Sequence, residues 1–502
     1  MIQAKKHNNK KQTLIKNSGK VFTPDYLVCN ILDFAGYNGP QILGKHIIDN
    51  SCGAGAFLTE IVSRYIIAAI NSGYDLHQLK NELEQYIHGI EIEDSAYNVL
   101  APNLDAVASR FGIVNVSWDI IHDDALSVTR FDNSMDFVIG NPPYVRVHNL
   151  NDSYESVKSF SFAEDGMTDL YLVFYELGLK ALRKGGKLCY ITPSSWMTSL
   201  AGANFRQYIR LNKSLLSVID LGHYQPFDAT AYTLIALFQK GVRHDFISYF
   251  VYDGKARDKR FVCKIAYNEF DISDRFYLST PADLKELKAI RCAKTPKYAC
   301  VKNGFATLSD KVFIGNVPEV DITIPIIKAS TGIWYRGLFP YTQEGKPIPV
   351  NELFSDPEVK DYLEAHKKEL QKGKEENDDW MYYGRTQALK DVSRNKFSIN
   401  TIIKDKSSIK LYRVPKGCGV YSGLYILTDV PEEILRDILI SDEFVRYVNL
   451  LKKYKSGGYY TFNSKDLEQF INHRLNKYII TRHFNFSFPS KNVSLYDNRY
   501  PL

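Results

Sequence analysis

The stretch "IIDNSCGAGAFLTE" at residues 47–60 decides the fold, because three kinds of local structure follow one another within it. An apolar strand pattern ends on the carboxylate of Asp49, a turn of small residues follows, and a helical pattern then begins. Gly53 and Gly55 allow the backbone of the turn to approach a ligand closely. Because a single Gly-x-Gly also occurs in ordinary tight turns, the stretch alone predicts a strand–turn–helix unit with a candidate cleft.

This alternation of strands and helices continues along the first half of the chain. Strands are predicted at 45–50, 86–93, 116–121, 136–140, 215–222 and 232–240, helices at 58–70 and 96–111, and a helix followed by a strand within 168–193. Such a pattern is typical of an α/β fold with a doubly wound sheet. We expect the last strand to run antiparallel, because too few residues precede it for a crossover helix.

The second half of the chain has a different pattern and a different charge. Beyond about residue 241 it mixes short strands, Tyr- and Lys-rich loops and a charged helical segment at 355–378, so we expect a domain boundary at 245/246. Residues 1–240 hold 21 of the 63 Lys and Arg residues but 24 of the 57 Asp and Glu residues. This imbalance favours chemistry in the first half and contact with a polyanion in the second, although solvated surface charge explains it equally well.

Composition excludes several other classes of protein. A chain of 502 residues with 45% hydrophobic and 24% charged residues is typical of a globular protein of two or three domains. It has no apolar run long enough to span a membrane, and its basic first 18 residues lack the apolar core of a secretory signal. The seven cysteines form no Cys-x-x-Cys pair, which favours a reducing cytoplasm and predicts no structural zinc or other metal site.

Acidic residues end three successive predicted strands, at Asp49, Glu91 and Asp124. Because parallel strands end at the same edge of a sheet, these carboxylates should surround one pocket, where Glu91 could accept both hydroxyls of a ribose and Asp124 an adenine amino group. Taken alone, Glu91 is more simply a solvated acid. The sequence lacks both the Gly-Lys-Ser/Thr phosphate cradle and the full Gly-x-Gly-x-x-Gly pattern. An adenosine-bearing cofactor without a pyrophosphate therefore fits best, and S-adenosylmethionine is such a molecule.

The stretch "IGNPPYV" at 139–145 forms a stiff loop, because two consecutive prolines remove two backbone donors and fix two φ angles. Asn141 Oδ1 and the carbonyl oxygen of Pro142 are then acceptors at a fixed spacing, suited to both N–H groups of an exocyclic amine. Tyr144 offers a flat face for an extruded base. The structural alternative is a proline-stiffened turn with a buried tyrosine.

These motifs occur in a characteristic order: "TP" near the N-terminus, then "DNSCGAGAF", "GIEIE", "HDDAL", "NPPY", "TDLYLVF", "GGKLCYITPSSW" and "PFDATAYTLIALFQK". Residues 19–240 thereby resemble the gamma-class, TaqI-like N6-adenine DNA methyltransferases of restriction–modification systems. The resemblance implies a basic tail over 1–18, a Rossmann-like methyltransferase domain with a doubly wound sheet over 19–245, and a mixed α+β target-recognition domain over 246–502.

The resemblance also implies roles for individual residues. The residues expected to bind S-adenosylmethionine are Thr23, Asp49, Glu91, Asp124 and the backbone around Ala125, beside the turn at Gly53 and Gly55. The residues expected to hold the target adenine are Asn141, Pro142 and Tyr144, with Phe227 packing against the flipped base. One departure is Asn50, which stands where the family usually has proline.

The second half has a looser likeness to target-recognition regions, at 301–315, 380–389 and 452–470. These segments are glycine-broken loops with Lys, Arg, Tyr and Trp, residues suited to contacts with phosphates and bases. For a single residue such as Arg385 or Lys455, a solvated side chain is at least as good an interpretation. The lysines of the N-terminal tail, Lys5, Lys6, Lys10 and Lys11, could also touch DNA, but a frayed tail is the better interpretation.

The sequence thus predicts an enzyme that methylates adenine N6 in double-stranded DNA, acting as a monomer in a prokaryotic cytoplasm at the nucleoid. Cleavage is expected to belong to a separate restriction endonuclease, because few residues precede the first motif and no nuclease constellation follows. A cytosine-C5 enzyme would present its nucleophile on a Pro-Cys dipeptide, and none occurs. By family analogy, Asn ahead of Pro-Pro-Tyr also favours adenine over cytosine N4. Two alternatives stay open: a protein-glutamine methyltransferase and a catalytically silent DNA-specificity subunit.

Overall fold

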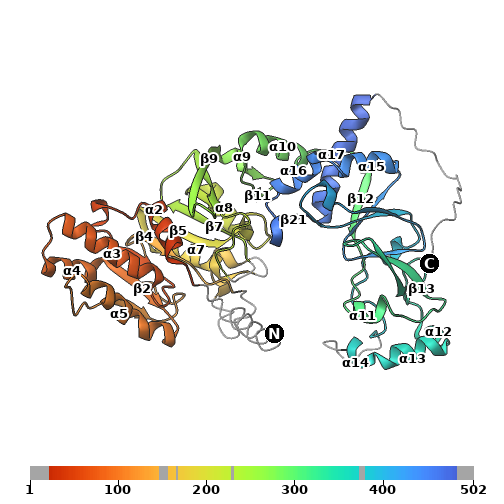
Figure 1. The fold of residues 1–502 in the computed structure, drawn as a ribbon, viewed down its shortest axis with the longest axis horizontal. Helices are drawn as coiled ribbons and strands as arrows, with labels where there is room; N and C mark the ends of the chain where they lie inside the picture. The colour runs from red at the N-terminus through yellow and green to blue at the C-terminus, as the bar shows by residue number, and fades with distance from the viewer. Residues whose placement is uncertain (1–21, 146–156, 165–167, 228–230, 372–378, 483–502) are drawn as a thin grey trace. The chain divides into compact units, whose positions relative to one another are not determined.

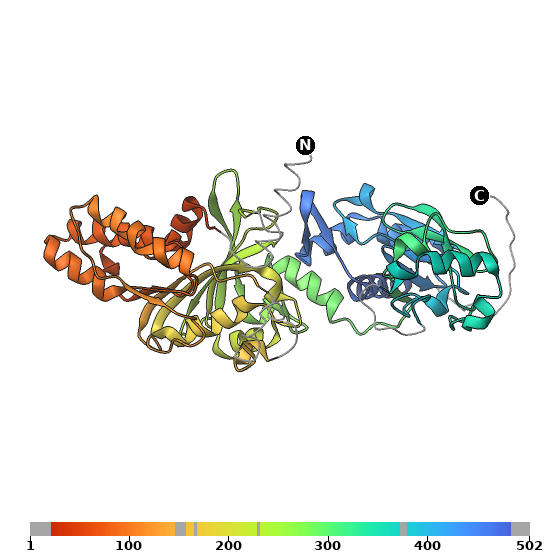
Figure 2. The ribbon, with the colours of Figure 1, turned by 90° about the horizontal axis from the view of Figure 1, so that it is seen from below.

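The computed structural model describes residues 22–145, 157–164, 168–227, 231–371 and 379–482. The chain divides into two compact units, residues 1–286 and 287–502. Figures 1 and 2 show unit 1 in red to green and unit 2 in green to blue. The tail 1–18 lies outside the described residues.

Unit 1 is built on a nine-stranded sheet in the order β3-β2-β1-β4-β5-β7-β6-β8-β9. Its strands are β1 (Ile47–Asp49), β2 (Ile87–Glu91), β3 (Asp119–His122), β4 (Met135–Gly140), β5 (Leu182–Pro193), β6 (Leu215–Asp220), β7 (Thr233–Gln239), β8 (Phe246–Asp253) and β9 (Asp258–Ala266). Strands β1 to β5 pair in parallel, whereas β7 pairs antiparallel with both β5 and β6. The predicted α/β class, the strand order of a wound sheet and the antiparallel strand at 232–240 are confirmed.

Helices cover both faces of this sheet. They are α2 (Asp25–Ala35), α3 (Ala56–Asn71), α4 (Leu76–Tyr86), α5 (Asp94–Ser109), α7 (Leu170–Ala181) and α8 (Ala203–Asn212). Helices α2 to α5 share one buried apolar cluster with β1 and β2, and Figure 2 shows α7 and α8 on the opposite face. Since each connection returns the chain to the start of the next parallel strand, the loops after β1, β2 and β4 meet at one edge.

The boundary between the units lies further along the chain than the sequence indicated. Strand β8 pairs in parallel with β6, and β9 pairs antiparallel with β8, so a hairpin beyond residue 245 extends the same sheet. The division therefore falls at 286/287 and not at 245/246. The two strands follow one another without a helix, which is why the repeating strand–helix pattern ended before the unit did.

Short segments join the sheet of unit 1 to unit 2: α9 (Tyr267–Phe270), β10 (Asp271–Ile272), β11 (Arg275–Phe276) and α10 (Pro281–Arg291). The described residues of unit 2 then form three small sheets, in the orders β12-β19-β15-β17, β14-β13-β18 and β16-β21-β20. Its strands are β12 (Ala299–Asn303), β13 (Thr323–Lys328), β14 (Ile333–Leu338), β15 (Lys396–Ile399), β16 (Ile402–Ile403), β17 (Leu411–Val414), β18 (Gly419–Tyr421), β19 (Leu424–Thr428), β20 (Tyr454–Lys455) and β21 (Tyr459–Thr461).

Helices of varied length surround these sheets, as the predicted mixed α+β class requires. They are α11 (Asp310–Phe313), α12 (Val350–Leu353), α13 (Pro357–Ala365), α14 (Lys367–Leu370), α15 (Glu432–Leu439), α16 (Asp442–Leu450) and α17 (Ser464–Arg482). The helix predicted over 355–378 is two helices, α13 and α14, because the chain leaves helical geometry at His366; residues 372–378 lie outside the description.

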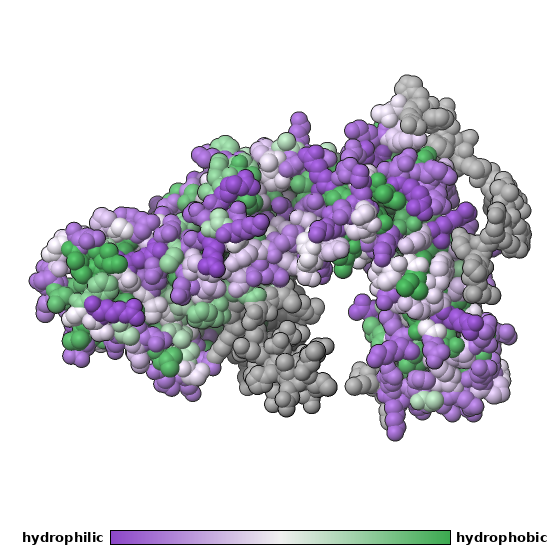
Figure 3. All heavy atoms as spheres, viewed as in Figure 1, coloured by the Kyte–Doolittle hydropathy of each residue, from purple (hydrophilic) through white to green (hydrophobic). Residues whose placement is uncertain are grey.

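Figure 3 shows hydrophilic side chains over most of the visible face of both units. A green apolar patch lies over α3 and α4, and these two helices carry the half-exposed apolar side chains of Ile67, Ile70 and Leu76. Among the described residues, no helix is long and apolar enough to cross a membrane.

Candidate functional site

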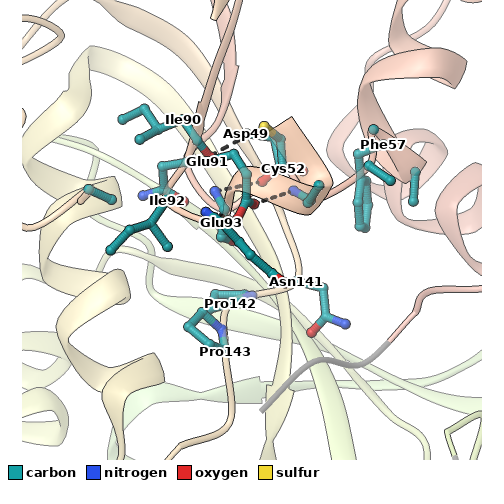
Figure 4. Close-up of a pocket in the computed structure, with 18 of the residues that line it drawn as sticks. Asp49, Cys52, Phe57, Ile90, Glu91, Ile92, Glu93, Asn141, Pro142 and Pro143 are labelled. Atoms are coloured by element: carbon teal, nitrogen blue, oxygen red, sulfur yellow. Dashed lines mark hydrogen bonds between the residues drawn. The ribbon is translucent and has the colours of Figure 1, made fainter. Parts of the chain in front are cut away.

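A cavity of about 780 Å³ opens at the carboxyl edge of β1, β2 and β4. Strand β1 pairs with β2 on one side and with β4 on the other, so the loops that follow these strands meet there. Every residue that the sequence assigned to a cofactor lines this cavity: Thr23, Asp49, Gly53, Gly55, Glu91, Asp124 and Ala125. Asn141 and Pro142 line it as well, and Figure 4 shows them opposite the glycine turn.

Asp49 is a buried carboxylate at the end of β1, with 1% of its surface exposed. Its Oδ1 accepts a hydrogen bond of 3.1 Å from the backbone N–H of Ser51. Within the described part of the chain no basic side chain forms an ion pair with it. Burial, together with the smaller effect of the nearby charge of Glu91, raises the pKa of Asp49 to about 7, although the hydrogen bond from Ser51 N lowers it. A carboxylate in this state attracts a cationic group of a ligand.

Strand β4 makes room for that carboxylate with a glycine. A Cβ atom on Gly140 would lie 2.5 Å from Asp49 Oδ1, a separation that real side chains do not adopt. The glycine that precedes the Asn-Pro-Pro loop therefore sets how closely β4 approaches the end of β1.

Glu91 ends β2 and holds the glycine turn in place. Its Oε2 accepts a hydrogen bond of 2.7 Å from Gly53 N, and its Oε1 accepts one of 2.8 Å from Glu93 N. Gly53 and Gly55 have φ angles of 56° and 95°, a left-handed region that glycine adopts without strain. A Cβ on Gly55 would also lie 2.6 Å from Leu100 Cδ1. The turn is thus fixed with its backbone toward the cavity (Figure 4).

Apolar side chains that the sequence analysis did not name complete the cavity. Ile92 directly follows Glu91 and is 63% exposed, and Phe22 is 75% exposed beside Thr23. On another wall, Asp124 Oδ1 accepts a hydrogen bond of 3.0 Å from Leu126 N, which fixes the loop after β3. A pocket that combines strand-end carboxylates with exposed apolar surface suits a molecule with a flat heterocycle and a polar sugar. An apolar residue directly after a strand-end acid was the available signal for Ile92.

The Asn-Pro-Pro loop is tied to the start of α2. Asn141 Nδ2 donates a hydrogen bond of 3.0 Å to the hydroxyl of Thr23, a side chain with only 2% of its surface exposed. This bond joins residues that are 118 positions apart in the sequence. It also fixes the orientation of the amide, because Nδ2 and not Oδ1 faces the Thr23 hydroxyl. The pairing could not be predicted from spacing.

Tyr144 and Phe227 lie together, but in an aromatic cluster and not among the residues that line the cavity. Their ring centroids are 6.3 Å apart with an interplanar angle of 73°, and Tyr171 packs edge-on against Tyr144 at 6.4 Å. The Tyr144 hydroxyl donates a hydrogen bond of 3.1 Å to Ile191 O in β5. Burial raises the pKa of Tyr144 above its usual value, so its hydroxyl keeps the proton that this bond needs.

Asn50, the departure from the usual proline, has a structural use. Its Oδ1 accepts a hydrogen bond of 2.7 Å from the buried hydroxyl of Tyr190 in β5. Asn50 thereby links the end of β1 to β5 and leaves the carboxylate of Asp49 at the cavity.

Two of the three segments singled out in the second half meet in unit 2. Gly384 N donates a hydrogen bond of 2.9 Å to Thr307 O, and Gln387 Nε2 donates one of 2.6 Å to Gly304 O. Segments 301–315 and 380–389 are therefore adjacent loops, whereas segment 452–470 forms the β20–β21 hairpin and the start of α17. Arg385 and Lys455 are exposed.

No group of three or more His, Cys, Asp or Glu side chains in the described ranges could hold a metal ion. All seven cysteines are free thiols.

A wound sheet with an antiparallel seventh strand, and a cavity beside a glycine turn after β1, define a Rossmann-like class I methyltransferase fold. The comparisons with known proteins agree and are more specific. Residues 60–227 match the family model described as Eco57I restriction-modification methylase. The chain carries an Eco57I-like restriction–modification methylase domain, and S-adenosylmethionine is the cofactor that this fold and family imply.

Several curated relatives match over most of the chain. The chain is 25% identical to the type II methyltransferase M.BstVI of Geobacillus stearothermophilus over 405 residues, which cover 69% of the chain and 70% of the relative. It is 29% identical to M.PaeR7I of Pseudomonas aeruginosa over 412 residues, with 70% and 67% covered. It is 23% identical to RM.Eco57I of Escherichia coli, a restriction enzyme and methyltransferase of which it spans 52%.

Two solved structures share the fold over nearly the whole chain. The type IIL restriction-modification enzyme MmeI, solved in complex with DNA, has a TM-score of 0.59 at 12% identity, covering 93% of this chain and 68% of that one. A nuclease-deletion mutant of the type ISP enzyme LlaGI, solved with a DNA substrate mimic, has a TM-score of 0.53 at 11% identity, covering 95% and 56%.

Proposed function

We propose that the protein is a site-specific methyltransferase that transfers a methyl group from S-adenosylmethionine to adenine N6 in duplex DNA, as the modification component of a restriction–modification system. The observation that carries the proposal is that two features lie side by side. The Asn141–Pro142 loop follows β4, and the acid-lined cavity opens at the end of β1, the parallel strand next to it. The relatives named type II methyltransferases support it.

The residues at the cavity fit the cofactor. S-adenosylmethionine carries its methyl group on a positively charged sulfur, together with an ammonium group, and Asp49 is a buried carboxylate without a cationic partner among the described residues. Glu91 would accept the ribose hydroxyls and Asp124 the adenine amino group, and Ile92 and Phe22, which also line the cavity, would be apolar surfaces for the adenine ring. Asp49 would hold the charged end of the cofactor, and the glycine turn would bring the backbone against it.

Asn141 and Pro142 would activate the substrate. An exocyclic amine is a poor nucleophile because its lone pair is delocalised into the ring. When Asn141 Oδ1 and the Pro142 carbonyl oxygen accept both N–H groups, the nitrogen is drawn toward a pyramidal geometry in which the lone pair faces the methyl group. The bond from Asn141 Nδ2 to Thr23 keeps the amide oxygen in the accepting orientation.

Tyr144 and Phe227 would receive the target base. An adenine inside a duplex cannot reach the cavity, so it must be extruded and stacked on a flat surface. The Tyr144 ring is held by its bond to Ile191 O and by its edge-on contact with Phe227, so it is a stacking surface that is rigid before the base arrives.

Unit 2 would recognise the target sequence. A Cβ on Gly384 would lie 2.3 Å from Leu308 Cδ1, so the Leu308 side chain lies across this glycine. Leu308 is 66% exposed and has a φ angle of 60°, an unusual conformation for leucine, and the exposed Arg385 is next to the glycine. An exposed apolar side chain and an exposed arginine on adjacent loops suit contact with base edges and phosphates.

We infer further that the protein acts as a monomer in the bacterial cytoplasm at the nucleoid, and that cleavage belongs to a separate endonuclease. Bacterial relatives and seven free thiols support this setting. A silent specificity subunit would not need the acid-lined cavity, and a protein-glutamine methyltransferase would not need a second unit of mixed sheets.

Long-read sequencing tests this function directly. The gene is expressed in a bacterial host that lacks adenine methylation, and the host DNA is sequenced with and without it. We expect N6-methyladenine within one recurring sequence in the expressing cells only. Unmodified adenines in both samples, with the protein present, would overturn the proposal.

A further inference from the structure

The β8–β9 hairpin, which extends the sheet, ends in a basic tip, residues 253–260, formed by the turn and the strand residues next to it. We propose that this tip binds the phosphates of duplex DNA beside the target-base site. The inference rests on the proposed function, because it names a contact surface for the same substrate.

The tip carries more positive than negative charge, with Lys255, Arg257, Lys259 and Arg260 against Asp253 and Asp258. Lys255, Arg257 and Arg260 are exposed, and in the part of the chain that the structure describes they form no ion pair. Asp253 uses Oδ1 to accept hydrogen bonds of 2.9 and 3.1 Å from Lys255 N and Ala256 N. Asp253 therefore stabilises the turn, and the other carboxylate of the tip, Asp258, lies 3.8 Å from Lys259 Nζ.

The tip is attached to helix α2. Arg257 has a φ angle of 53°, and its guanidinium carbon lies 4.7 Å from the centroid of the Tyr26 ring. Its carbonyl oxygen accepts a hydrogen bond of 2.7 Å from Asn30 Nδ2. A backbone conformation that is unfavourable for residues other than glycine is thus held by two contacts with one helix.

The tip is also attached to the loop after β6. The hydroxyls of Tyr26 and Tyr224 are hydrogen-bonded at 2.5 Å, and the rings of Tyr224 and Tyr252 lie 5.1 Å apart. A Cβ on Gly254 would lie 2.4 Å from Tyr224 Cδ2, so the turn packs directly against that ring. The tip is therefore a fixed part of unit 1 and not a free loop; Figure 2 shows the hairpin beside α2.

Both attachment points lead to the proposed target site. Helix α2 begins two residues after Thr23, which accepts the hydrogen bond from Asn141. Tyr224 precedes Phe227 by three residues on the same loop. A base extruded toward Asn141 brings its flanking phosphates near these segments, and exposed Lys and Arg side chains there would neutralise them.

The salt dependence of DNA binding tests the proposal. The double variant Lys255→Ala/Arg260→Ala removes two charges and leaves Arg257, which packs on Tyr26. The matched control is Arg110→Ala/Lys184→Ala, which removes two exposed charges at the amino edge of the same sheet. Affinity for a fluorescein-labelled duplex is measured over a range of NaCl concentrations, and thermal melting and S-adenosylmethionine affinity report folding.

We expect the slope of log affinity against log salt to become shallower by about 1.8 in the hairpin variant, at about 0.9 per phosphate contact, and to stay unchanged in the control. The loss should be similar for duplexes with and without the methylated sequence. An unchanged slope in the hairpin variant, or an equal change in the control, would overturn the hairpin proposal. If the wild-type protein still methylates DNA in that case, the proposed function is unaffected. A shallower slope in a protein that methylates no duplex would instead overturn the proposed function alone.

Discussion

Asp49 in unit 1 and Asp466 in unit 2 are both almost completely buried, at 1% and 2% exposure, but their surroundings are opposite. Asp466 Oδ1 lies 2.8 Å from Arg291 Nη1, and its Oδ2 pairs with Lys453 and accepts a hydrogen bond of 3.0 Å from Asn463 N. Burial alone would raise the pKa of Asp466, but these partners outweigh it and hold the pKa below the usual value.

At Asp49 burial prevails, and its pKa rises to about 7. The difference teaches how to separate the two uses of a buried acid. A carboxylate that stabilises the fold is surrounded by its own counter-charges, whereas a carboxylate at a binding site receives its counter-charge from the ligand. Asp391 belongs to the first kind, with Lys302 Nζ at 2.6 Å and the Tyr425 hydroxyl at 2.7 Å.

The largest effect should come from removing the paired acid. Asp466→Ala leaves Arg291 and Lys453 without their shared carboxylate, which should cost about 3–5 kcal/mol of unfolding free energy. Chemical denaturation of the full chain measures it. The control is Asp442→Ala, because Asp442 pairs with Lys406 at the exposed surface and should contribute at most about 1 kcal/mol. Equal losses in the two variants would contradict the distinction.

The next largest effect concerns the reaction and not the fold. Asn141→Ala removes one of the two proposed acceptors for the adenine amino group, and kcat should fall by about 10²–10³-fold or more. Affinity for S-adenosylmethionine, measured by calorimetry, should stay nearly unchanged. Normal turnover in this variant would show that the amide does not hold the substrate.

Removing the charge of the unpaired acid should weaken the cofactor site and spare the fold. Asp49→Asn keeps the shape of the side chain, and S-adenosylmethionine affinity should fall by about ten- to hundredfold, as expected for one hydrogen bond to a charged group. The cofactor-free variant should melt at the same or a higher temperature, because a buried charge is gone. A large loss of melting temperature would place Asp49 with Asp466 as a structural acid.

The smallest effect is a pH dependence of opposite sign at the two acids. The native pKa of Asp49 lies above the unfolded value, so its contribution to stability falls as pH rises from about 4 to about 7, while cofactor affinity rises with pH and levels off above about 7. The pKa of Asp466 is lowered, so its contribution is present above about pH 4 and is lost as pH falls. Calorimetric titrations of the protein with S-adenosylmethionine from pH 5 to 9 check the rise in cofactor affinity, and Asp49→Asn should abolish this rise.

Much of unit 1 could be predicted because its sheet follows a regular rule. The apolar strands at 45–50 and 86–93 appear as β1 and β2, and Asp49 and Glu91 at their ends line one cavity because parallel strands share one carboxyl edge. Helix α4 was missed, although Asp75 and Gln78 form a capping box at its start, because it buries only Leu79 and Leu83. The β8–β9 hairpin was assigned to the wrong side of the boundary, since its place is decided by backbone pairing with β6.

The site was predicted as a set of residue types but not as a set of contacts. Which side chain orients Asn141, and where the Tyr144 hydroxyl is anchored, depend on Thr23 and Ile191, which the fold brings from distant segments. Ile92 was missed although it directly follows a strand-end acid, and Phe22 was missed because a single exposed apolar residue has no pattern of its own. In unit 2, short irregular strands carry little periodic signal, so only the compositional character of the loops could be inferred.

One measurement tests the central claim most directly. Purified protein is incubated with methyl-labelled S-adenosylmethionine and duplexes of varied sequence, and the DNA is digested to nucleosides and separated. The account predicts label in N6-methyldeoxyadenosine for duplexes that contain the target sequence. Label confined to cytosine, or to protein with every adenine unmodified, would contradict it.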